Sequence, residues 1–202
     1  MQWLVTGGAG FIGSHVVDRL VERGDQVRVL DDLSSGRREF LSHHLDAGRV
    51  DLRIVDLTDY EATVPHFEGI DRVIHLAANP DIRLGTRVTD TDLRHGTIAT
   101  YNVLESMRQH GVKDIAFASS SVVYGEGAPL PTPETHGPCV PISLYGASKS
   151  AGEGLIGAYV GTFGFRAWIF RFANIIGGAS SSVGGPRVGE RRFLNDGRDC
   201  VG

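Results

Sequence analysis

Tyr145 and Lys149 are four residues apart, a spacing that places a phenol and an ammonium on one face of a helix. A tyrosine is a poor base at neutral pH because its pKa is near 10, and a fixed neighbouring cation favours the phenolate. The pair is therefore suited to taking a proton from a substrate hydroxyl, although an exposed pair on a surface helix would have the same spacing. The other face of this helix is expected to carry apolar residues, namely Ala147, Ala151, Leu155 and Val160.

A glycine-rich stretch from Gly7 to Gly13 follows the first apolar run and opens an amphipathic segment. Gly7 allows a sharp turn, Gly10 lets backbone N–H groups approach a pyrophosphate, and Gly13 lets the helix pack closely on the strand. The helix would begin at Phe11 and Ile12, where unpaired N–H groups and the positive end of the helix dipole attract phosphates. A glycine-rich turn alone is often only a tight connection, so its surroundings decide the interpretation.

The second apolar run ends in Asp31, 18 residues after Gly13. A carboxylate about 20 residues beyond such a turn is typical of a residue that holds the adenosine ribose of a dinucleotide. Asp31, followed by Asp32, accepts hydrogen bonds from a 2′-hydroxyl and repels a 2′-phosphate. The sequence therefore predicts NAD rather than NADP as the cofactor.

The residues after Asp32 are expected to lie against the same half of NAD. Ser34 and Gly36 belong to a segment without lysine. Arg37 and Arg38 lie just beyond it and could favour a 2′-phosphate. A solvent-exposed first helical turn is the preferred interpretation of these two arginines.

Three serines, Ser119 to Ser121, come directly after the fifth apolar run. Open α/β sheets bind ligands at the carboxyl ends of their strands, so Ser120 is expected near Tyr145 and Lys149. Taken alone, serines after a strand more often only begin the polar loop that follows it. Together with the glycine turn and the Tyr–Lys pair, they favour a catalytic site made of Ser120, Tyr145 and Lys149.

Six short apolar runs rich in β-branched residues are predicted to be buried strands, with stretches of helical periodicity between them. Alternating strands and helices indicate an α/β protein with a parallel sheet. Because crossovers are right-handed, the simplest closure is a Rossmann-like, doubly wound sheet with helices on both faces. The predicted strands are Trp3 to Thr6, Gln26 to Leu30, Asp51 to Val55, Arg72 to Leu76, Ile115 to Ala118 and Ala167 to Phe170.

The pattern of strands and helices stops near Gly177. Residues 1–176 are expected to form one NAD-binding domain that includes the candidate catalytic residues. Residues 177–202 show neither periodicity and are expected to be an irregular tail or linker, with a folded tail of unusual type as the alternative. The proline-rich segment from Gly125 to Pro141 is predicted to be a long loop over the sheet.

The composition is that of one compact domain, with 202 residues of which 41% are apolar. A formal net charge of −4 offers no basic surface for nucleic acid or an anionic membrane. No apolar run is long enough to cross a bilayer and no signal peptide is recognisable, so a cytoplasmic location is expected. Cys139 and Cys200 lie far apart without metal-ligand spacing, so neither a disulfide nor a metal site is expected.

The three motifs together resemble the extended short-chain dehydrogenase/reductase superfamily, and within it the NAD-dependent sugar-nucleotide epimerases and dehydratases. The resemblance runs from Met1 to about Gly177 and is strongest to the enzymes that interconvert UDP-glucose and UDP-galactose. It implies further contacts: Asp56 and Leu57 with the adenine, Leu76, Ala77 and Ala78 beside the pyrophosphate and nicotinamide ribose, and Asn174 with the diphosphate of the substrate.

One position departs from the family pattern. The family usually has an asparagine near Gly96, where this chain has His95, Gly96 and Thr97. A contact from such an asparagine to the nicotinamide half of NAD is therefore not carried over to this chain.

The resemblance implies epimerisation at C4 of a UDP-hexose. In the family mechanism, Tyr145 takes the proton of the C4 hydroxyl while a hydride passes to NAD. Lys149 holds the nicotinamide ribose and lowers the pKa of the tyrosine, Ser120 hydrogen-bonds the same sugar oxygen, and Ser121 also lies at the substrate. A transient 4-keto sugar turns over and takes the hydride back on its other face, so the cofactor carries the chemistry and the protein positions the groups.

Two other functions are weighed against epimerisation. Dehydratases and decarboxylases of the superfamily typically carry a carboxylate just after the catalytic serine, and Ser121, Val122 and Val123 stand there instead, which leaves elimination of water without its general acid. An NAD-binding module without turnover is less expected because Tyr145 and Lys149 are both present. The length of the chain favours this second hypothesis, because family members are longer and build most of the sugar-nucleotide pocket from a C-terminal domain.

The resemblance also implies a homodimer in an intact form. Family members commonly pair two helices from each subunit into a four-helix bundle. The candidates here are the helices predicted from Leu93 to Gln109 and from Ser143 to Phe163.

Overall fold

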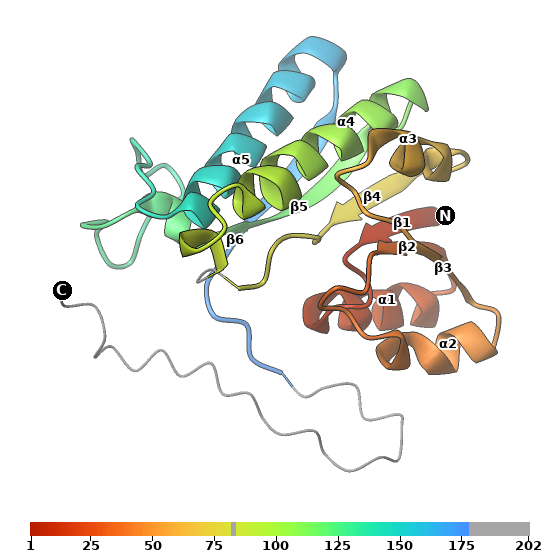
Figure 1. Cartoon of the computed structure of the whole chain (residues 1–202). Helices are drawn as coiled ribbons and strands as arrows, with labels where there is room; N and C mark the ends of the chain where they lie inside the picture. Colours follow the sequence, from red (N-terminus) through yellow and green to blue (C-terminus); the bar gives the residue numbers. More distant parts are fainter. Residues whose placement is uncertain (82–83, 178–202) are drawn as a thin grey trace.

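A computed structural model describes residues 1–81 and 84–177 (Figure 1). Six parallel strands form one sheet in the order β3-β2-β1-β4-β5-β6. This is the strand order of the Rossmann fold, and the order reverses between β1 and β4. The strands are β1 (Gln2–Thr6), β2 (Gln26–Asp31), β3 (Val50–Ile54), β4 (Arg72–His75), β5 (Asp114–Ser120) and β6 (Arg166–Phe172).

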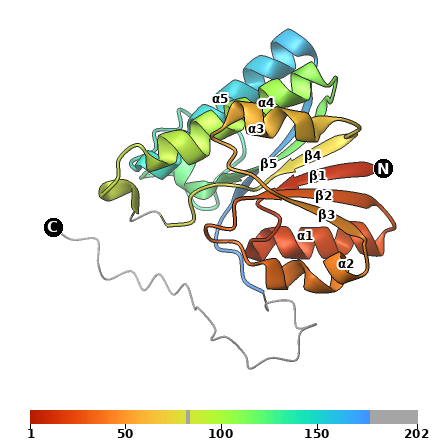
Figure 2. The same cartoon turned by 45° about the vertical axis from the view of Figure 1, so that its right-hand side comes forward.

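Helices cover both faces of the sheet, as Figure 2 shows. The predicted Rossmann-like fold is therefore confirmed. On one face lie α1 (Phe11–Glu22) and α2 (Ser42–Asp46), and on the other α3 (Tyr60–Thr63), α4 (Ala99–Gln109) and α5 (Leu144–Phe163). Short 3₁₀ turns, η1 (Arg38–Leu41), η2 (Val64–Phe67), η3 (Leu84–Thr86) and η5 (Ser121–Tyr124), and one π-helical segment, η4 (Leu93–Ile98), complete the connections.

The sheet separates two apolar cores. Val5, Val17 and Val29 belong to the core beneath α1 and α2. Leu104 and Phe117 belong to the larger core beneath α4 and α5, and both are almost fully buried. Because both faces of the central strands are covered, consecutive residues such as Leu4 and Val5 are apolar and buried, which explains why the strands could be predicted from short apolar runs.

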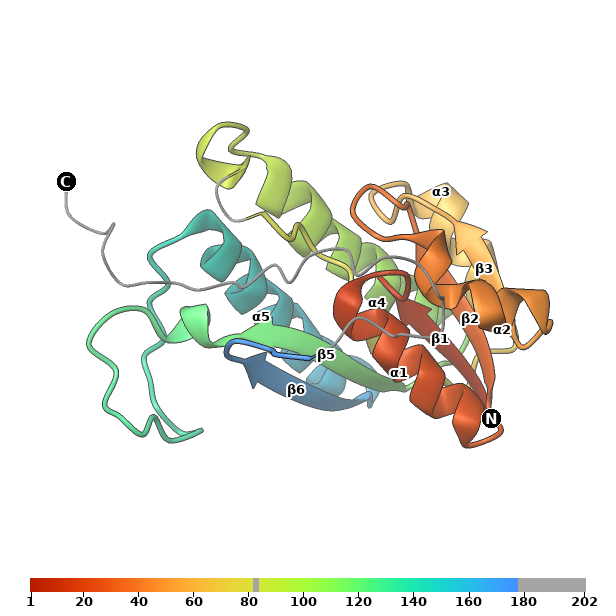
Figure 3. The ribbon, with the colours of Figure 1, turned by 90° about the horizontal axis from the view of Figure 1, so that it is seen from below.

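The sheet face next to α1 is only partly covered, and Figure 3 looks onto it. β6 presents Phe170 and Phe172 to this face, beside Ile12 and Ala116. Phe170 is 48% exposed and Trp168, on the same side of the strand, is 50% exposed. Among the described residues, no helix packs over β5 and β6 on this side, so the strands keep an apolar surface in contact with solvent.

Of the four apolar residues predicted on the other face of α5, Leu155 is partly buried and packs against the larger core. Ala147, Ala151 and Val160 are exposed, and the helix buries the face that carries Lys149. The buried face of α5 can pack closely on β5 because it carries glycine: a Cβ on Gly152 would lie only 2.9 Å from the ring of Phe117. The close approach of helix and strand is what takes the ammonium group out of water.

The predicted loop from Gly125 to Pro141 contains neither helix nor strand. The predicted tail, 177–202, lies outside the described residues apart from Gly177, as does Cys200. Within the described part of the chain, no helix is both long and apolar enough to cross a membrane.

Replacing Gly13 with alanine tests the close packing at the start of α1. An added Cβ would lie 2.1 Å from the backbone oxygen of Gly7, which cannot move without opening the turn. We expect Gly13→Ala to lower the free energy of unfolding by about 1–3 kcal/mol in urea titrations. Gly161→Ala, where a Cβ meets no other atom, is the matched control and should leave stability unchanged or raise it by up to about 1 kcal/mol. Equal effects of the two variants would contradict this account.

Candidate active site

A buried chain of hydrogen bonds lies where the sheet order reverses. Thr100 Oγ1 donates to the carbonyl of Gly96 (2.6 Å), so it accepts from Nε2 of His75 (3.0 Å). Nδ1 of His75 then accepts from Thr6 Oγ1 (2.7 Å), which also accepts from the backbone amides of Leu76 (3.2 Å) and residue 77 (3.3 Å). Burial lowers the pKa of His75 to about 3, with the charge of a nearby lysine adding to the effect. The ring is therefore neutral and joins the ends of β1 and β4 to α4.

The glycine turn leaves β1 at this point. Gly7 has a φ of +67°, and a Cβ there would lie 2.8 Å from the amide nitrogen of Ala77. Gly10 is the N-cap of α1, and no side chain caps it. The first amides of α1, at Phe11 and Ile12, have no carbonyl partner within the helix. Gly13 packs against the turn itself rather than against the strand.

Asp31 holds the turn from the neighbouring strand. Its Oδ2 accepts from the amide of Ala9 (2.9 Å) and its Oδ1 from the amide of Leu33 (2.9 Å). Burial raises the pKa of Asp31, the two amide hydrogen bonds lower it, and the charge of Asp32 raises it further, with a net increase. Each oxygen keeps a second lone pair, so the carboxylate can still accept from a ribose hydroxyl.

The chain bends tightly around the Asp31 carboxylate. Leu33 has a φ of +59°, a conformation that costs a side-chain-bearing residue roughly 1–3 kcal/mol. Asp32 accepts hydrogen bonds from the amide and the hydroxyl of Ser34 (2.9 and 2.6 Å). A Cβ on Gly36 would lie 2.6 Å from Asp31 Oδ1, so only glycine fits. Asp32, Ser34 and Gly36 therefore lie beside Asp31.

The loop after β3 places Asp56 and Leu57 at the same edge of the sheet. Burial alone would raise the pKa of Asp56, but hydrogen bonds from Thr58 and nearby positive charges lower it overall. Asn102, which is 4% exposed, donates from Nδ2 to the carbonyl of Leu57 (2.8 Å). Sequence reasoning missed this role of Asn102, because its partner lies 45 residues away.

Leu76, Ala77 and Ala78 follow β4 and are partly exposed. They lie opposite the glycine turn, because the amides of Leu76 and Ala77 bond to Thr6. The turn and this segment therefore lie on the two sides of the place between β1 and β4 where the strand order reverses, which we call the switch point.

Lys149 lies beneath the candidate catalytic tyrosine. It is 3% exposed, and its Nζ donates to the carbonyl of Ala118 (2.6 Å). Nζ lies 4.9 Å from the ring centre of Phe117 and 5.7 Å from that of Tyr145. Burial lowers the pKa of Lys149 to about 8.

Tyr145 and Ser120 are brought together by the fold. Burial raises the pKa of Tyr145, the negative charge of Asp92 raises it further, and a hydrogen bond with Ser120 lowers it. The expectation that Lys149 brings this pKa into a useful range is therefore wrong for the protein without cofactor. A phenol in this environment keeps its proton until positive charge is added nearby.

Asp92 is a buried carboxylate that sequence reasoning did not identify. It is 2% exposed, its Oδ1 accepts from Asn79 Nδ2 (3.0 Å), and its Oδ2 has no hydrogen-bond partner. Gly85 leaves room for Oδ2, since a Cβ there would lie 2.4 Å from it. The residue begins the π-helical segment η4, a rare element often found at functional sites.

The departure at Gly96 has a packing reason. A Cβ at this position would lie 2.4 Å from Oγ of Ser148 on α5. The contact between η4 and α5 therefore requires glycine, and an asparagine side chain does not fit without moving the helix.

A second polar group connects α5 to β6. Glu153 accepts from Ser119 Oγ (2.5 Å) and forms two hydrogen bonds with Arg171 (3.0 and 2.7 Å). Asn174 follows β6 and is exposed, and Ser121 is partly exposed at the start of η5. Both residues lie on the edge where the strands end, but no contact joins them to Tyr145.

The arrangement brings a glycine turn, a buried carboxylate and a Ser–Tyr–Lys group to one edge of the sheet. Such a site is suited to proton exchange with a hydroxyl group held beside a dinucleotide. Phe11 and Ile12 turn their side chains toward residues 175–177 rather than toward the switch point, so only their amides are available to a phosphate.

The chain is similar to a set of known enzymes. The model of the NAD dependent epimerase/dehydratase family matches residues 3–189. The UDP-glucose 4-epimerase of Halalkalibacterium halodurans is 35% identical over 190 residues, which cover 94% of this chain and 54% of that protein. A solved UDP-galactose 4-epimerase is 48% identical, with a TM-score of 0.81, over 89% of this chain and 58% of that one.

A third relative was solved with a dinucleotide. The UDP-glucose 4-epimerase of Thermus thermophilus, in complex with NAD, is 36% identical, with a TM-score of 0.74, over 85% of this chain and 54% of that one. The chain spans about half the length of the curated relatives it matches.

The buried ammonium of Lys149 predicts a pH dependence of stability. Its pKa is about 8 in the folded chain against an ordinary value of 10.5, so between these values the unfolded chain binds more protons. Stability from this group therefore rises with pH in that window and is lowest below pH 8. From pH 7 to pH 9.5, wild-type protein should gain about 2 kcal/mol of unfolding free energy relative to Lys149→Met, as measured by urea titration. Parallel pH profiles of the two proteins would refute the burial of a charged lysine.

Proposed function

Because the chain belongs to the NAD dependent epimerase/dehydratase family, we propose that it binds NAD and carries the catalytic half of a UDP-hexose 4-epimerase. The observation that carries this proposal is the meeting of Ser120, Tyr145 and Lys149 at the sheet edge where the glycine turn leaves β1. The relatives named as UDP-glucose and UDP-galactose 4-epimerases support the choice of substrate.

The proposed cofactor site consists of residues from four loops, from the start of α1 and from α5. Amides at the start of α1 bind the pyrophosphate, and Asp31 accepts from the adenosine ribose and disfavours a 2′-phosphate. The loop after β3 borders the adenine. The full set is Gly7, Gly10, Phe11, Ile12, Gly13, Asp31, Asp32, Ser34, Gly36, Asp56, Leu57, Leu76, Ala77, Ala78, Tyr145 and Lys149.

Tyr145 exchanges the proton of the sugar C4 hydroxyl in this proposal. Bound NAD supplies the acceptor and donor of the C4 hydride, so the sugar passes through a 4-keto form. Ser120 hydrogen-bonds the C4 oxygen, and Lys149 keeps a positive charge below the phenol. A cationic nicotinamide ring would add to the charge of Lys149, and the two together would lower the pKa of Tyr145.

Elimination of water is the less supported reaction. Ser121, Val122 and Val123 provide no carboxylate beside the catalytic serine. The Glu153 carboxylate is engaged by Ser119 and Arg171 and is not available as a general acid. NAD binding without turnover remains the second candidate for the chain on its own, because Ser120, Ser121 and Asn174 are the only substrate contacts proposed within the described residues.

Asp31→Ala tests the cofactor assignment. Loss of a charged hydrogen bond to the ribose should weaken NAD binding by about 1–3 kcal/mol in calorimetric titrations. Asp46→Ala is the control, because this exposed carboxylate on α2 lies outside the proposed cofactor site. Thermal unfolding of each variant separates loss of binding from loss of the turn. A wild-type protein that prefers NADP would overturn the assignment.

Tyr145→Phe tests the catalytic assignment. We expect the 202-residue chain to bind NAD without interconverting UDP-glucose and UDP-galactose, since remote binding energy is needed to orient the sugar. A chimera of residues 1–177 with the C-terminal half of the Halalkalibacterium halodurans relative should be active. Tyr145→Phe in the chimera should abolish turnover and leave NAD affinity within a few fold. A variant with near wild-type turnover would exclude Tyr145 as the base, and release of a 4-keto-6-deoxy sugar or carbon dioxide would indicate a dehydratase or decarboxylase.

A homodimer through α4 and α5 is part of the proposal, and a cytoplasmic location remains a prediction from the sequence. The two helices lie side by side (Figure 1). Their outward faces expose Tyr101 (46%), Val160 (39%) and Phe163 (40%). The exposed residues Ala147 and Ala151 allow a second copy to approach closely.

Ala151→Arg tests the dimer. An added arginine on the proposed interface should give a monomer in light scattering, because a buried unpaired charge is costly. Asp46→Arg, on α2 of the opposite layer, should leave the dimer intact. A wild-type protein that is monomeric at high concentration would contradict the interface.

A further inference from the structure

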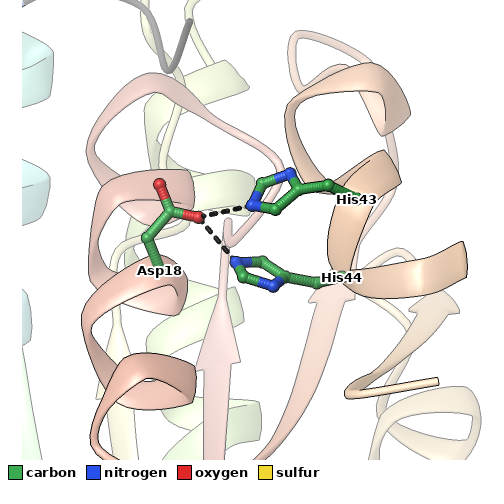
Figure 4. A group of neighbouring side chains, drawn as sticks. All are labelled: Asp18, His43 and His44. Carbon is green, nitrogen blue, oxygen red and sulfur yellow. Dashed lines mark hydrogen bonds and ion pairs between the residues drawn. The ribbon is translucent and has the colours of Figure 1, made fainter. Parts of the chain in front are cut away.

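Asp18, His43 and His44 form a cluster outside the proposed active site. Asp18 lies on α1 and the two histidines on α2, and both rings turn Nε2 toward the same carboxylate oxygen (Figure 4). The distances to Asp18 Oδ1 are 3.3 Å from His43 and 2.7 Å from His44. Within residues 1–81 and 84–177, this is the one group of at least three such side chains whose donor atoms all lie within 4.8 Å of one another.

The spacing of the donor atoms matches a tetrahedral metal centre. Zinc–nitrogen and zinc–oxygen bonds of about 2.0–2.2 Å at tetrahedral angles place neighbouring ligand atoms about 3.3 Å apart. The His43–Asp18 pair already has this separation. The His44–Asp18 pair must open by about 0.6 Å, which a rotation of the carboxylate can supply.

The donor types select the ion. Two imidazole nitrogens with one carboxylate oxygen suit Zn²⁺ and neighbouring transition metals, whereas Mg²⁺ and Ca²⁺ prefer oxygen ligands alone. One carboxylate offsets half of the charge of a divalent ion. We propose that Asp18, His43 and His44 bind one divalent transition-metal ion, with Zn²⁺ the fitting ion and water in the remaining position.

The histidines can change from hydrogen bonding to metal binding without losing a proton. A neutral imidazole that binds through Nε2 carries its hydrogen on Nδ1. Binding through Nε2 would place the hydrogen of His44 on Nδ1, which is buried and has no hydrogen-bond partner, so the bond to the ion must offset one unpaired N–H group. His43 is 29% exposed in its side chain and gives the ion a route from solvent.

A metal ion here would bind side chains from two neighbouring helices, α1 and α2. η1 and α2 follow the bend around Asp31, and the amide of Arg37 bonds to the carbonyl of Ala9 (2.9 Å). The contacts of Asp18 with both histidines already join α1 to α2, and a bound ion would replace them with metal–ligand bonds. Because it binds only the folded chain, it should raise the temperature of unfolding.

Calorimetric titration of metal-free protein with Zn²⁺ tests the proposal. We expect one ion per chain, a higher unfolding temperature with Zn²⁺, and no such change with Mg²⁺. Asp18→Asn keeps an oxygen that accepts both hydrogen bonds but removes the anionic ligand, and His43→Ala removes a partly exposed donor. Each variant should bind Zn²⁺ at least about tenfold more weakly. His66→Ala, which removes a histidine outside the cluster, should bind as wild type.

Binding of Co²⁺ gives an independent readout, because visible absorption bands report its coordination geometry. Bands that form with wild-type protein and are lost in both cluster variants would support the site. Absence of Zn²⁺ binding would overturn it, and so would binding that both variants retain, which would place the ion on other histidines or on cysteine. The two variants remove different donors, and circular dichroism identifies one that fails to fold, so the other decides.

Discussion

The buried hydrogen bonds from Thr6 through His75 to Thr100 are the interaction on which the site depends. β1 and β4 are neighbours in the sheet, but their following loops must separate so that a ligand can lie between them. A neutral histidine with both nitrogens engaged fixes where that separation begins. The glycine turn lies on one side of this point, and the proposed catalytic residues Tyr145 and Lys149 lie beyond the other.

The burial of charged side chains is the second property of the site. The fold buries the Lys149 ammonium and the Asp92 carboxylate, and it raises the pKa of Tyr145. Burial of the ammonium and of the carboxylate is costly for each group alone. Positive charge from a bound cofactor beside Tyr145 would lower the pKa of the phenol, so cofactor binding and the proton chemistry of the tyrosine are coupled in our proposal.

The sequence predicted the strands and the position of the glycine turn well, because β-branched runs and glycine spacing are local signals. It failed where contacts join distant segments. The buried face of α5 depends on Gly152 packing against Phe117, a contact that helical periodicity does not reveal. The roles of Asn102 and Asp92 depend on partners in other loops, and the cluster of Asp18 with the two histidines joins two helices with no metal-ligand spacing in the sequence.

The central claim is that a dinucleotide lies across the switch point with its nicotinamide toward Tyr145. Amide chemical-shift mapping by heteronuclear NMR during titration with NAD tests this most directly. The account predicts shifts at residues 7–13, 31–36, 56–57, 76–78 and 145–149, with α2 and the outer end of α4 unaffected. Saturating NAD that leaves these amides unchanged, or that shifts those lining the groove between α1 and residues 175–177 instead, would contradict it.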